Sequence, residues 1–429
     1  MKKRNLRWSI LALGLFVATT LAITSCGRDA IFFTISMEVP PQPPRIRGGP
    51  TQMVVFNWGT ESEPKPVLFV ASGSLFWYSP EPESPNPNMQ EAGVGNGTTV
   101  LGGVNASWGR DIGISQPPGR VIDIAATQRY LYALTGGGIN NTLYRTNSNN
   151  DNWERVGSGN IQSIFADGER LFAGIRTGSS GTTAIYGISS VSDDEATLDP
   201  LDSLTIPNTR LLTGAVSDGA SSFILSTNGG VFRSDGSTLT HLSNADADPG
   251  YGEQPPFTEI IVGMIRLPNN SIIAVGRGGF LHNVTGNSIE RIRSGEDVTG
   301  EWMSTGRPAT SALAIWEGNI DGADGGKVLA VGVQGSLTAA TFNNGYVEFL
   351  LDENGALDID EPRREANNLA SVQGEHGQYR GSLGRLPLNH LFQAPWEIDE
   401  YMTFFASTQT AGLWSFRTLD GVPQWNAEN

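Results

Sequence analysis

The sequence predicts an all-β fold, a seven-bladed β-propeller of four-stranded antiparallel blades, and three observations lead to this prediction. One hairpin pattern recurs along the chain. A further β-like run precedes every copy, and a weaker run follows most copies. The first strand of each hairpin is almost continuously apolar, as expected for a strand covered on both faces. Four antiparallel strands repeated about every 40 to 75 residues are typical of propeller blades.

The repeated hairpin is clearest between Ser221 and Asp235, where an apolar run leads into Ser-Thr-Asn-Gly-Gly and a second short apolar run. Gly229 and Gly230 can adopt positive φ without the cost of a Cβ atom, as a tight turn between antiparallel strands requires. In the sixth copy the second strand is expected directly after Gly335. The seven copies are residues 67–78, 130–146, 171–189, 223–234, 272–283, 328–341 and 404–416.

The flanking runs complete the expected blades. The runs before the hairpins are residues 53–56, 121–124, 161–165, 211–216, 260–265, 312–316 and 386–392, and the clearest runs after them are 153–156, 239–242, 289–292 and 346–351. A β-sandwich, or two in tandem, is the alternative, but it would not repeat one hairpin seven times. Six or eight blades would follow if the run at Ile31 or the segment 81–111 is miscounted.

Two segments at predicted turns between third and fourth strands, 148–153 and 234–238, are degenerate versions of the motif Ser-x-Asp-x-Gly-x-Thr-Trp. The chain therefore resembles the Asp-box propellers, an architecture shared by sialidases, sortilin-like receptors and photosystem II assembly factors. In that family the box stabilises a turn remote from the active site. The resemblance implies a fold and no particular activity.

The first 25 residues predict an export signal, with four basic residues followed by the apolar run from Ile10 to Ala22. A signal anchor is the alternative, which the short apolar run disfavours. The next residues, Ile-Thr-Ser-Cys ending at Cys26, resemble the bacterial lipobox, with Ile in the first position as in spirochaete-type lipoproteins. The resemblance implies cleavage before Cys26 and its lipidation. Gly27 after the cysteine implies sorting to the outer membrane rather than the inner one.

Cys26 is the only cysteine, which excludes a structural disulfide and argues against a thiolate metal site. After it come the apolar run Ile31–Ile35 and a stiff Pro-rich linker, Pro40–Pro44. The run is either a strand of the folded domain or a segment beside the membrane. We therefore expect a signal peptide at 1–25, a lipidated Cys with a short strand and linker at 26–50, and the propeller at 51–429.

The charge balance excludes one class of function. The chain has a formal net charge of −16, which becomes −20 when the signal and its four basic residues are removed. Such a surface repels nucleic acids and anionic headgroups. We expect no nucleic-acid partner.

The residues that could support catalysis or metal binding form no recognisable constellation in the sequence. A sialidase-like site needs three converging arginines, whereas the arginines here (Arg129, Arg145, Arg170, Arg233 and Arg277) are scattered and several lie at predicted strand ends, where a solvated position is expected. The four histidines, His241, His282, His376 and His390, lack metal-ligand spacing and are interpreted as surface or turn residues. The acidic loops 246–250, 321–326 and 358–361 could offer oxygen ligands to Ca²⁺, but solvated turn acids are the preferred interpretation, so we expect no metal and no cofactor.

Long connections between blades are the expected interaction surface. Three successive ones, Ser243–Thr258, Ser294–Thr310 and Asp352–Gly384, are longer than most loops and should lie on one face. They are rich in carboxylates and contain aromatic side chains, as interfaces do; tolerated surface insertions are the alternative. The candidate partner-binding residues are Asp246, Asp248, Tyr251, Trp302, Asp358, Asp360, Glu361 and Tyr379.

The sequence thus predicts a membrane-anchored lipoprotein of the cell envelope whose propeller binds a protein or an envelope component without catalysis. The alternative is a glycan-acting hydrolase or lyase with its site in the axial opening. Fold alone does not decide between them.

Overall fold

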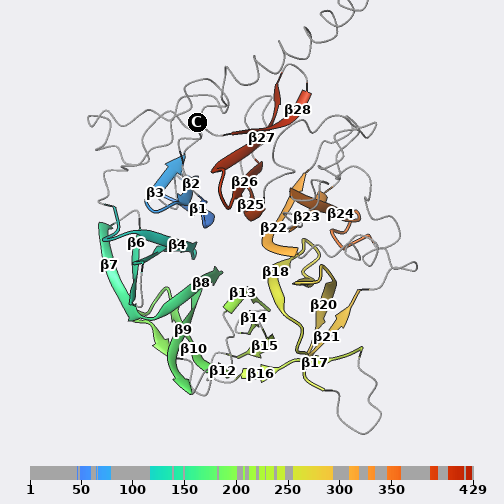
Figure 1. Ribbon diagram of the computed structural model, residues 1–429, viewed down its shortest axis with the longest axis horizontal. Helices are drawn as coiled ribbons and strands as arrows, with labels where there is room; N and C mark the ends of the chain where they lie inside the picture. The colour runs from blue at the N-terminus through green and yellow to red at the C-terminus, as the bar shows by residue number, and fades with distance from the viewer. Residues whose placement is uncertain are drawn as a thin grey trace, which may run out of the picture. The chain divides into compact units, whose positions relative to one another are not determined.

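The computed structural model is all-β, with seven antiparallel sheets arranged in a ring (Figure 1). In each sheet the strands follow one another outward from an innermost strand, and each innermost strand contacts the innermost strands of the two neighbouring sheets. The predicted seven-bladed β-propeller is confirmed. The structure describes residues 46, 49–58, 64, 66–78, 116–137, 140–147, 150–180, 183–200, 206–207, 212–218, 222–227, 229–235, 239–246, 255–292, 309–317, 327–333, 345–358, 387–394, 404–419 and 422–427.

The blades are numbered in chain order. Blade 1 contains β1 (Gln52–Asn57), β2 (Pro66–Ala71) and β3 (Leu75–Tyr78). Blade 2 contains β4 (Val121–Ala126), β5 (Leu131–Thr135), β6 (Asn141–Asn147) and β7 (Asn150–Gly159). Blade 3 contains β8 (Ile161–Asp167), β9 (Arg170–Ser180) and β10 (Thr183–Ser192), with the short β11 (Asp199–Pro200) and β12 (Ile206–Pro207) both paired to β10.

Blade 4 contains β13 (Leu212–Ser217), β14 (Phe223–Thr227), β15 (Gly230–Ser234) and β16 (Leu239–His241). Blade 5 contains β18 (Ile261–Arg266), β19 (Ile272–Gly276), β20 (Leu281–Thr285) and β21 (Ser288–Arg291), and β17 (Ser243–Asn244) joins its outer edge in parallel. Blade 6 contains β22 (Ala309–Glu317), β23 (Lys327–Val333) and β24 (Gly345–Leu350). Blade 7 contains β25 (Leu388–Gln393), β26 (Phe404–Thr408), β27 (Leu413–Leu419) and β28 (Val422–Ala427).

The hydrophobic core is divided among the junctions between blades. Seven clusters of buried apolar side chains are described, and each combines residues from two adjacent blades. The second strands β5, β14, β19 and β26 are buried along their whole length. Their central small residues, such as Ala133, Ala274 and Ala406, have no exposed surface and let neighbouring sheets approach closely. The continuous apolar pattern of these strands was therefore a correct guide to burial on both faces.

The predicted turn of the repeated hairpin is confirmed in blade 4. Gly230 has φ of +143°, and a Cβ atom there would collide with the ring of His241 and lie 2.7 Å from the carbonyl oxygen of Phe257. The Thr227 hydroxyl donates to the carbonyl of Gly230 at 3.0 Å and accepts from the amide of Gly229 at 3.2 Å. Thr408 Oγ1 closes the equivalent turn of blade 7 by donating to Gly412 at 2.9 Å.

The sixth hairpin was predicted wrongly. β23 pairs with β24, in a register that joins Val328 to Leu350 and Val333 to Gly345. The run at 346–351, expected as a fourth strand, is therefore the third strand of the blade. Asp352–Ala356 then forms a turn, closed by the Ala356 amide donating to Asp352 Oδ1 at 2.8 Å, and Leu357 pairs back to Leu351. The start of the connection expected at Asp352–Gly384 is thus a turn inside blade 6.

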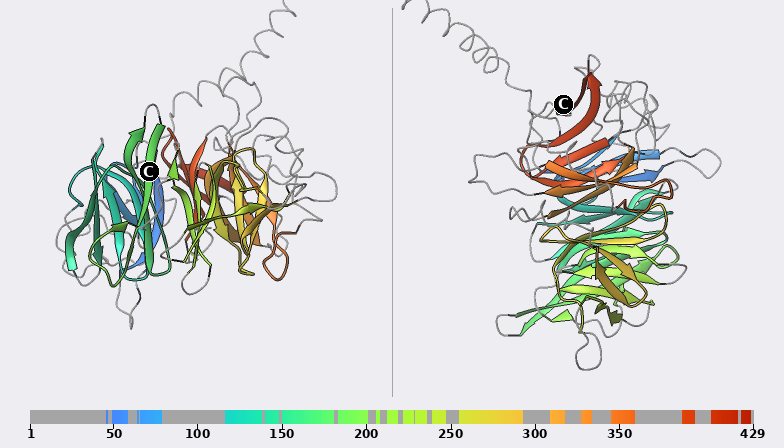
Figure 2. Two further views of the ribbon diagram at one scale, coloured as in Figure 1. Left: turned by 90° about the horizontal axis from the view of Figure 1, so that it is seen from below. Right: turned by 90° about the vertical axis from the view of Figure 1, so that its right-hand side faces the viewer.

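The two ends of the ring differ in the strand ends and turns that they contain. At one end each innermost strand begins, and in several blades a backbone amide of the second turn donates to the carbonyl just before that strand, as Gly136 does to Arg120 and Gln409 to Pro387. We call this end the entry face; its described residues include 49–51, 72–74, 119–120, 136–137, 140, 160, 176–178, 229, 255–260, 276–280, 387 and 409–412. The opposite end, which we call the far face, includes residues 127–130, 167–170, 192–195, 217–218, 267–271, 286–287 and 352–356. Figure 2 shows the blades of the ring from two further directions.

Candidate functional site

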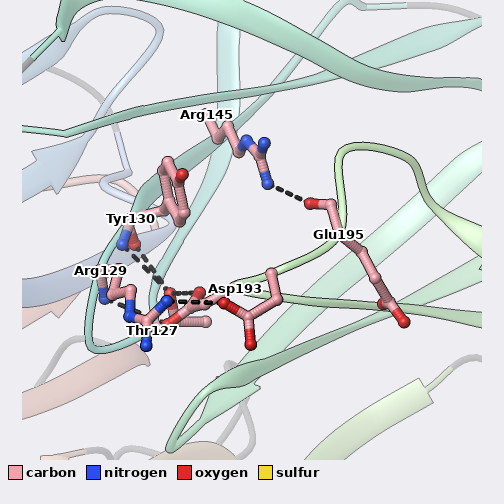
Figure 3. Close-up of polar contacts among 7 residues, drawn as sticks. Thr127, Arg129, Tyr130, Arg145, Asp193 and Glu195 are labelled. Carbon is pink, nitrogen blue, oxygen red and sulfur yellow. Dashed lines mark hydrogen bonds and ion pairs between the residues drawn. The ribbon is translucent and has the colours of Figure 1, made fainter.

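A polar cluster joins blades 2 and 3 at the far face (Figure 3). The Thr127 hydroxyl, at the end of the innermost strand of blade 2, donates to Oδ1 of Asp193 from blade 3. The Arg129 amide donates to Oδ2 of Asp193 at 3.2 Å, and the Tyr130 amide donates to Thr127 Oγ1 at 3.2 Å. Asp193 is only 5% exposed. Burial raises the pKa of the Asp193 carboxyl, against the opposing effect of these hydrogen bonds.

Arg145 extends the cluster along the third strand of blade 2. Its guanidinium lies 4.2 Å above the ring of Tyr130, its Nε donates to Glu154 Oε2 at 3.0 Å, and its Nη1 donates to the carbonyl of Glu195. Only 6% of Arg145 is exposed, so the solvated position expected for several of the arginines does not apply to it. The sequence could not reveal this, because Glu195 lies 50 residues away on the next blade.

Two other arginines from the sequence prediction have acidic partners as well. Arg129 Nη1 lies 2.7 Å from Asp194 Oδ1, and Arg233 pairs with Asp218. Like Arg145, both are therefore neutralised by carboxylates of the same chain. The cluster thus joins blades 2 and 3. The described arginines Arg129, Arg145 and Arg233 do not converge on a common point where a substrate carboxylate could bind.

A second set of polar contacts runs along the innermost strands. Six of these strands have a register shift near their start, as between Val121 and Asp123 in β4. Near these irregularities, side chains form hydrogen bonds to the backbone of the next blade, and we call these bonds the inner seam. They are Asn389 to Pro50 (3.2 Å), Thr51 to Ile122, Ile164 to Asp123 (3.5 Å), Ser163 to Leu212 (3.0 Å) and Thr213 to Ile261 (2.9 Å), donor first.

Asp123 is the ionisable member of the inner seam. Its carboxylate accepts the Ile124 amide at 2.9 Å and the Ile164 amide at 3.5 Å. Burial raises the pKa of Asp123 to about 7, although both hydrogen bonds act in the opposite direction. A carboxyl group with this pKa can exchange a proton near neutral pH, which is the property of a general acid or base. Sequence reasoning missed Asp123, because it reads as one polar residue within an apolar run.

The histidines are less exposed than predicted. His282 is 2% exposed, its Nε2 lies 3.1 Å from Glu259 Oε2, and its ring meets the edge of Phe257. Burial lowers the pKa of His390 to about 4, so its imidazole is neutral at physiological pH. The interpretation of His282 as a surface or turn residue is therefore wrong, and His390, which is half-buried, lies within β25 and not in a turn. His376 lies outside the described residues.

Two of the predicted partner-binding residues can be placed. Asp246 lies at the outer edge of blade 5, where its Oδ2 accepts the amide of Arg291 at 2.7 Å. The Asp358 amide donates to the carbonyl of Leu350 in blade 6 at 2.9 Å, directly after the turn that begins at Asp352 on the far face. No described contact joins Asp246 to Asp358. The remaining predicted residues, Asp248, Tyr251, Trp302, Asp360, Glu361 and Tyr379, and the lipidation residue Cys26, lie outside the described residues.

Within the described part of the chain, no three His, Cys, Asp or Glu side chains are grouped so that they could hold a metal ion. The same part contains no helix of the length and hydrophobicity needed to span a bilayer.

No family model and no curated protein matches the sequence. Solved structures with a similar fold include the extracellular domain of BT4673 from B. thetaiotaomicron, described as a one-component system, with 12% identity and a TM-score of 0.44 over 87% of this chain and 39% of that one. PorZ, described as a surface component of the type-IX secretion system of Porphyromonas gingivalis, has 11% identity and a TM-score of 0.41 over 90% of this chain and 39% of that one. YCF48 bound to a D1 peptide has 10% identity and a TM-score of 0.39 over 88% and 94%. This chain spans about two fifths of the first two proteins, and we transfer none of their activities to it.

Proposed function

We propose that the chain is a lipoprotein of the cell envelope, anchored through Cys26, whose propeller is a rigid, non-catalytic platform that binds another protein or an envelope component. This proposal rests on one observation: the charged side chains of the far-face cluster are occupied by contacts within the chain. Arg129, Arg145 and Asp193 bind other residues of the same chain and hold blades 2 and 3 together, in addition to the inner seam. A rigid ring presents its surface loops with little loss of entropy on binding.

Export and anchoring rest on the N-terminal sequence. Replacing Cys26 by Ser should abolish acylation and leave an uncleaved or mislocalised precursor. Metabolic labelling with a fatty acid tests this directly, and label retained by the Cys26→Ser variant would rule out the lipobox.

Binding can be tested with the non-lipidated domain starting at Pro44, where the compact unit of the ring begins. Immobilised domain should retain a specific envelope component, and the predicted contact residues Asp246, Tyr251 and Trp302 should be needed for this. The matched control is the Glu353→Gln variant, which changes an exposed carboxylate of the far-face turn in blade 6. Retention that is unaffected by all three contact substitutions would refute their role.

The alternative function, glycan cleavage at the axial opening, is favoured by one observation. Asp123, on an innermost strand, has a pKa of about 7 and could act as a general acid or base. Incubation of the domain with envelope glycans, followed by mass spectrometry of the products, tests this. Cleavage that is lost in the Asp123→Asn variant would replace the non-catalytic proposal.

A further inference from the structure

Two aspartates, one from each blade, form hydrogen bonds across the junction between blades 2 and 3. Asp123, near the start of β4 in blade 2, accepts the amide of Ile164 in blade 3 at 3.5 Å. Asp193, which follows β10 in blade 3, accepts the hydroxyl of Thr127 and the amide of Arg129 in blade 2 (Figure 3). Asp123 lies toward the entry face, whereas Asp193 lies at the far face. The two carboxyl groups therefore bond opposite ends of one junction.

The other described bonds of the inner seam come from side chains that do not ionise. Their donors are Asn389 between blades 7 and 1, Thr51 between blades 1 and 2, Ser163 between blades 3 and 4, and Thr213 between blades 4 and 5. Amide and hydroxyl groups of this kind keep their hydrogen bonds over the physiological pH range. Among the described inner-seam bonds, the one between blades 2 and 3 alone depends on a group that titrates.

The carboxyl group of Asp123 has no charged neighbour among the described influences on its pKa. Burial raises this pKa to about 7, and the amides of Ile124 and Ile164 act in the opposite direction. An ionised Asp123 is therefore a charge removed from water and stabilised only by two peptide amides, which is unfavourable. As the pH rises toward 7 and beyond, the closed junction becomes less stable relative to an open one in which water reaches the carboxylate.

Asp193 acts on the junction in the same direction. Burial is the largest influence on its pKa and raises it, whereas its hydrogen bonds lower it. Two charged side chains affect this pKa with opposite signs: Arg129, which pairs with Asp194 at 2.7 Å, lowers it, and Glu169 raises it. The remaining titratable group that interacts with Asp193 is Tyr132, which is neutral because burial raises its pKa to about 12.

We propose that the junction between blades 2 and 3 is a pH-dependent joint of the ring, closed while Asp123 and Asp193 are protonated and open to water more often once they are ionised. Each blade is a hydrogen-bonded sheet, so separating the two blades breaks the bonds at both ends together. Such local openings need less free energy than unfolding of the whole domain. The inference goes beyond the proposed function, because it requires neither a lipid nor a partner. It makes the rigidity of the platform at this joint depend on pH.

Hydrogen exchange of single amides in the full chain measures the opening of the joint. The amide of Ile164 reports the Asp123 end. The amide of Gln128, which donates to the carbonyl of Gly168 at 3.0 Å, crosses the same junction at the far face without contacting either carboxyl group. The control is the amide of Val121, which donates to the carbonyl of Gly73 at 3.1 Å across the junction between blades 1 and 2.

Protection factors, which divide out the direct effect of pH on exchange, are compared at pH 5.5 and pH 8. A carboxyl group with a pKa of about 7 in the closed joint and 3.8 in the open one shifts the opening equilibrium by up to about 30-fold over this range, and partial contact with water reduces this to about tenfold. We therefore expect the protection of Ile164 and Gln128 to fall by about tenfold and that of Val121 to change by less than about twofold.

Three results would overturn the proposal. The protection of Ile164 could show no fall, which would mean that the junction does not respond to pH. A fall at Ile164 without one at Gln128 would show a change confined to a single hydrogen bond. An equal fall at Val121 would show a general loosening of the ring.

A substitution identifies the controlling group. Asp123→Asn retains an acceptor for the Ile164 amide but cannot ionise, so it should remove most of the fall at Ile164 and also at the distant Gln128. The matched control is Asp167→Asn, which changes a carboxylate that accepts the amide of Ser217 across the junction between blades 3 and 4, and it should leave the fall unchanged. A full pH dependence at both amides in Asp123→Asn would overturn the proposal. If this variant does not fold, the comparison of the three amides in the wild type still decides.

Discussion

Replacing Asp123 by Asn should change the pH dependence of stability in a direction fixed by the structure. Burial raises the pKa of Asp123 in the folded protein from 3.8 to about 7. Between these pH values the unfolded chain has lost the proton and the folded chain keeps it. The contribution of Asp123 to stability is therefore complete below pH 3.8 and is lost progressively as the pH rises to about 7. Above pH 7 the loss is constant.

The magnitude follows from the size of the shift. One pKa unit corresponds to about 1.4 kcal/mol, so the full shift corresponds to at most about 4 kcal/mol, and partial contact with water reduces this to about 2–4 kcal/mol. Asn cannot ionise and can still accept the Ile124 amide through its side-chain oxygen. The free energy of unfolding of Asp123→Asn relative to the wild type should therefore rise by this amount between pH 4 and pH 8.

Urea unfolding of the domain from Pro44, followed by tryptophan fluorescence at pH 4, 5, 6, 7 and 8, measures this difference. The Glu353→Gln variant, which removes one charge at an exposed turn, shows how much of the change comes from net charge alone. A difference between Asp123→Asn and wild type that does not vary with pH would refute the raised pKa of this carboxyl. A difference that falls as the pH rises would show that the shift has the opposite sign.

Three further substitutions test how the ring is held together, each by urea or thermal unfolding. Gly230→Val should cost about 3 kcal/mol, because its Cβ would collide with His241 at positive φ, and an unchanged unfolding midpoint would contradict the turn. Ile46→Ala should cost about 2–4 kcal/mol through the cavity left beside Phe405; a loss below about 0.5 kcal/mol would show that Ile46 is not part of the core. Thr213→Val keeps the shape but removes the donor to Ile261, and should cost about 1–2 kcal/mol. Greater stability of this variant would show that the inner-seam bond is not favourable.

The sequence was sufficient to predict the repeating architecture because the periodic signal is local. Each blade is built from neighbouring strands, and the turn chemistry at Gly230 and the buried run of β14 can both be recognised within about a dozen residues. Blade 6 was assigned wrongly for a related reason. Ser336–Thr341 and Tyr346–Leu351 are both plausible partners for β23, and only the register Val328 to Leu350 decides between them.

The polar contacts could not be predicted in the same way. The environments of Arg145 and His282 depend on residues that the ring brings together from other strands or from the next blade. A charged residue at the end of a strand has the same local sequence whether it is solvated or paired across a junction. The raised pKa of Asp123 has a similar origin, since burial in the folded ring displaces it.

The joint between blade 7 and blade 1 has a consequence for the time course of folding. Inner-seam bonds elsewhere in the ring connect residues close in the chain, such as Thr213 and Ile261, 48 positions apart. The Asn389–Pro50 bond spans 339 positions, and blade 7 takes all four of its strands from the last part of the chain. Closing so long a loop costs more conformational entropy than closing the shorter ones, so this contact is the least favourable to form early in folding. The six other junctions can form as an open arc while the chain is still being synthesised. The ring closes only after the last strand has been synthesised. Until then, the apolar sides of blades 1 and 7 are exposed and can aggregate.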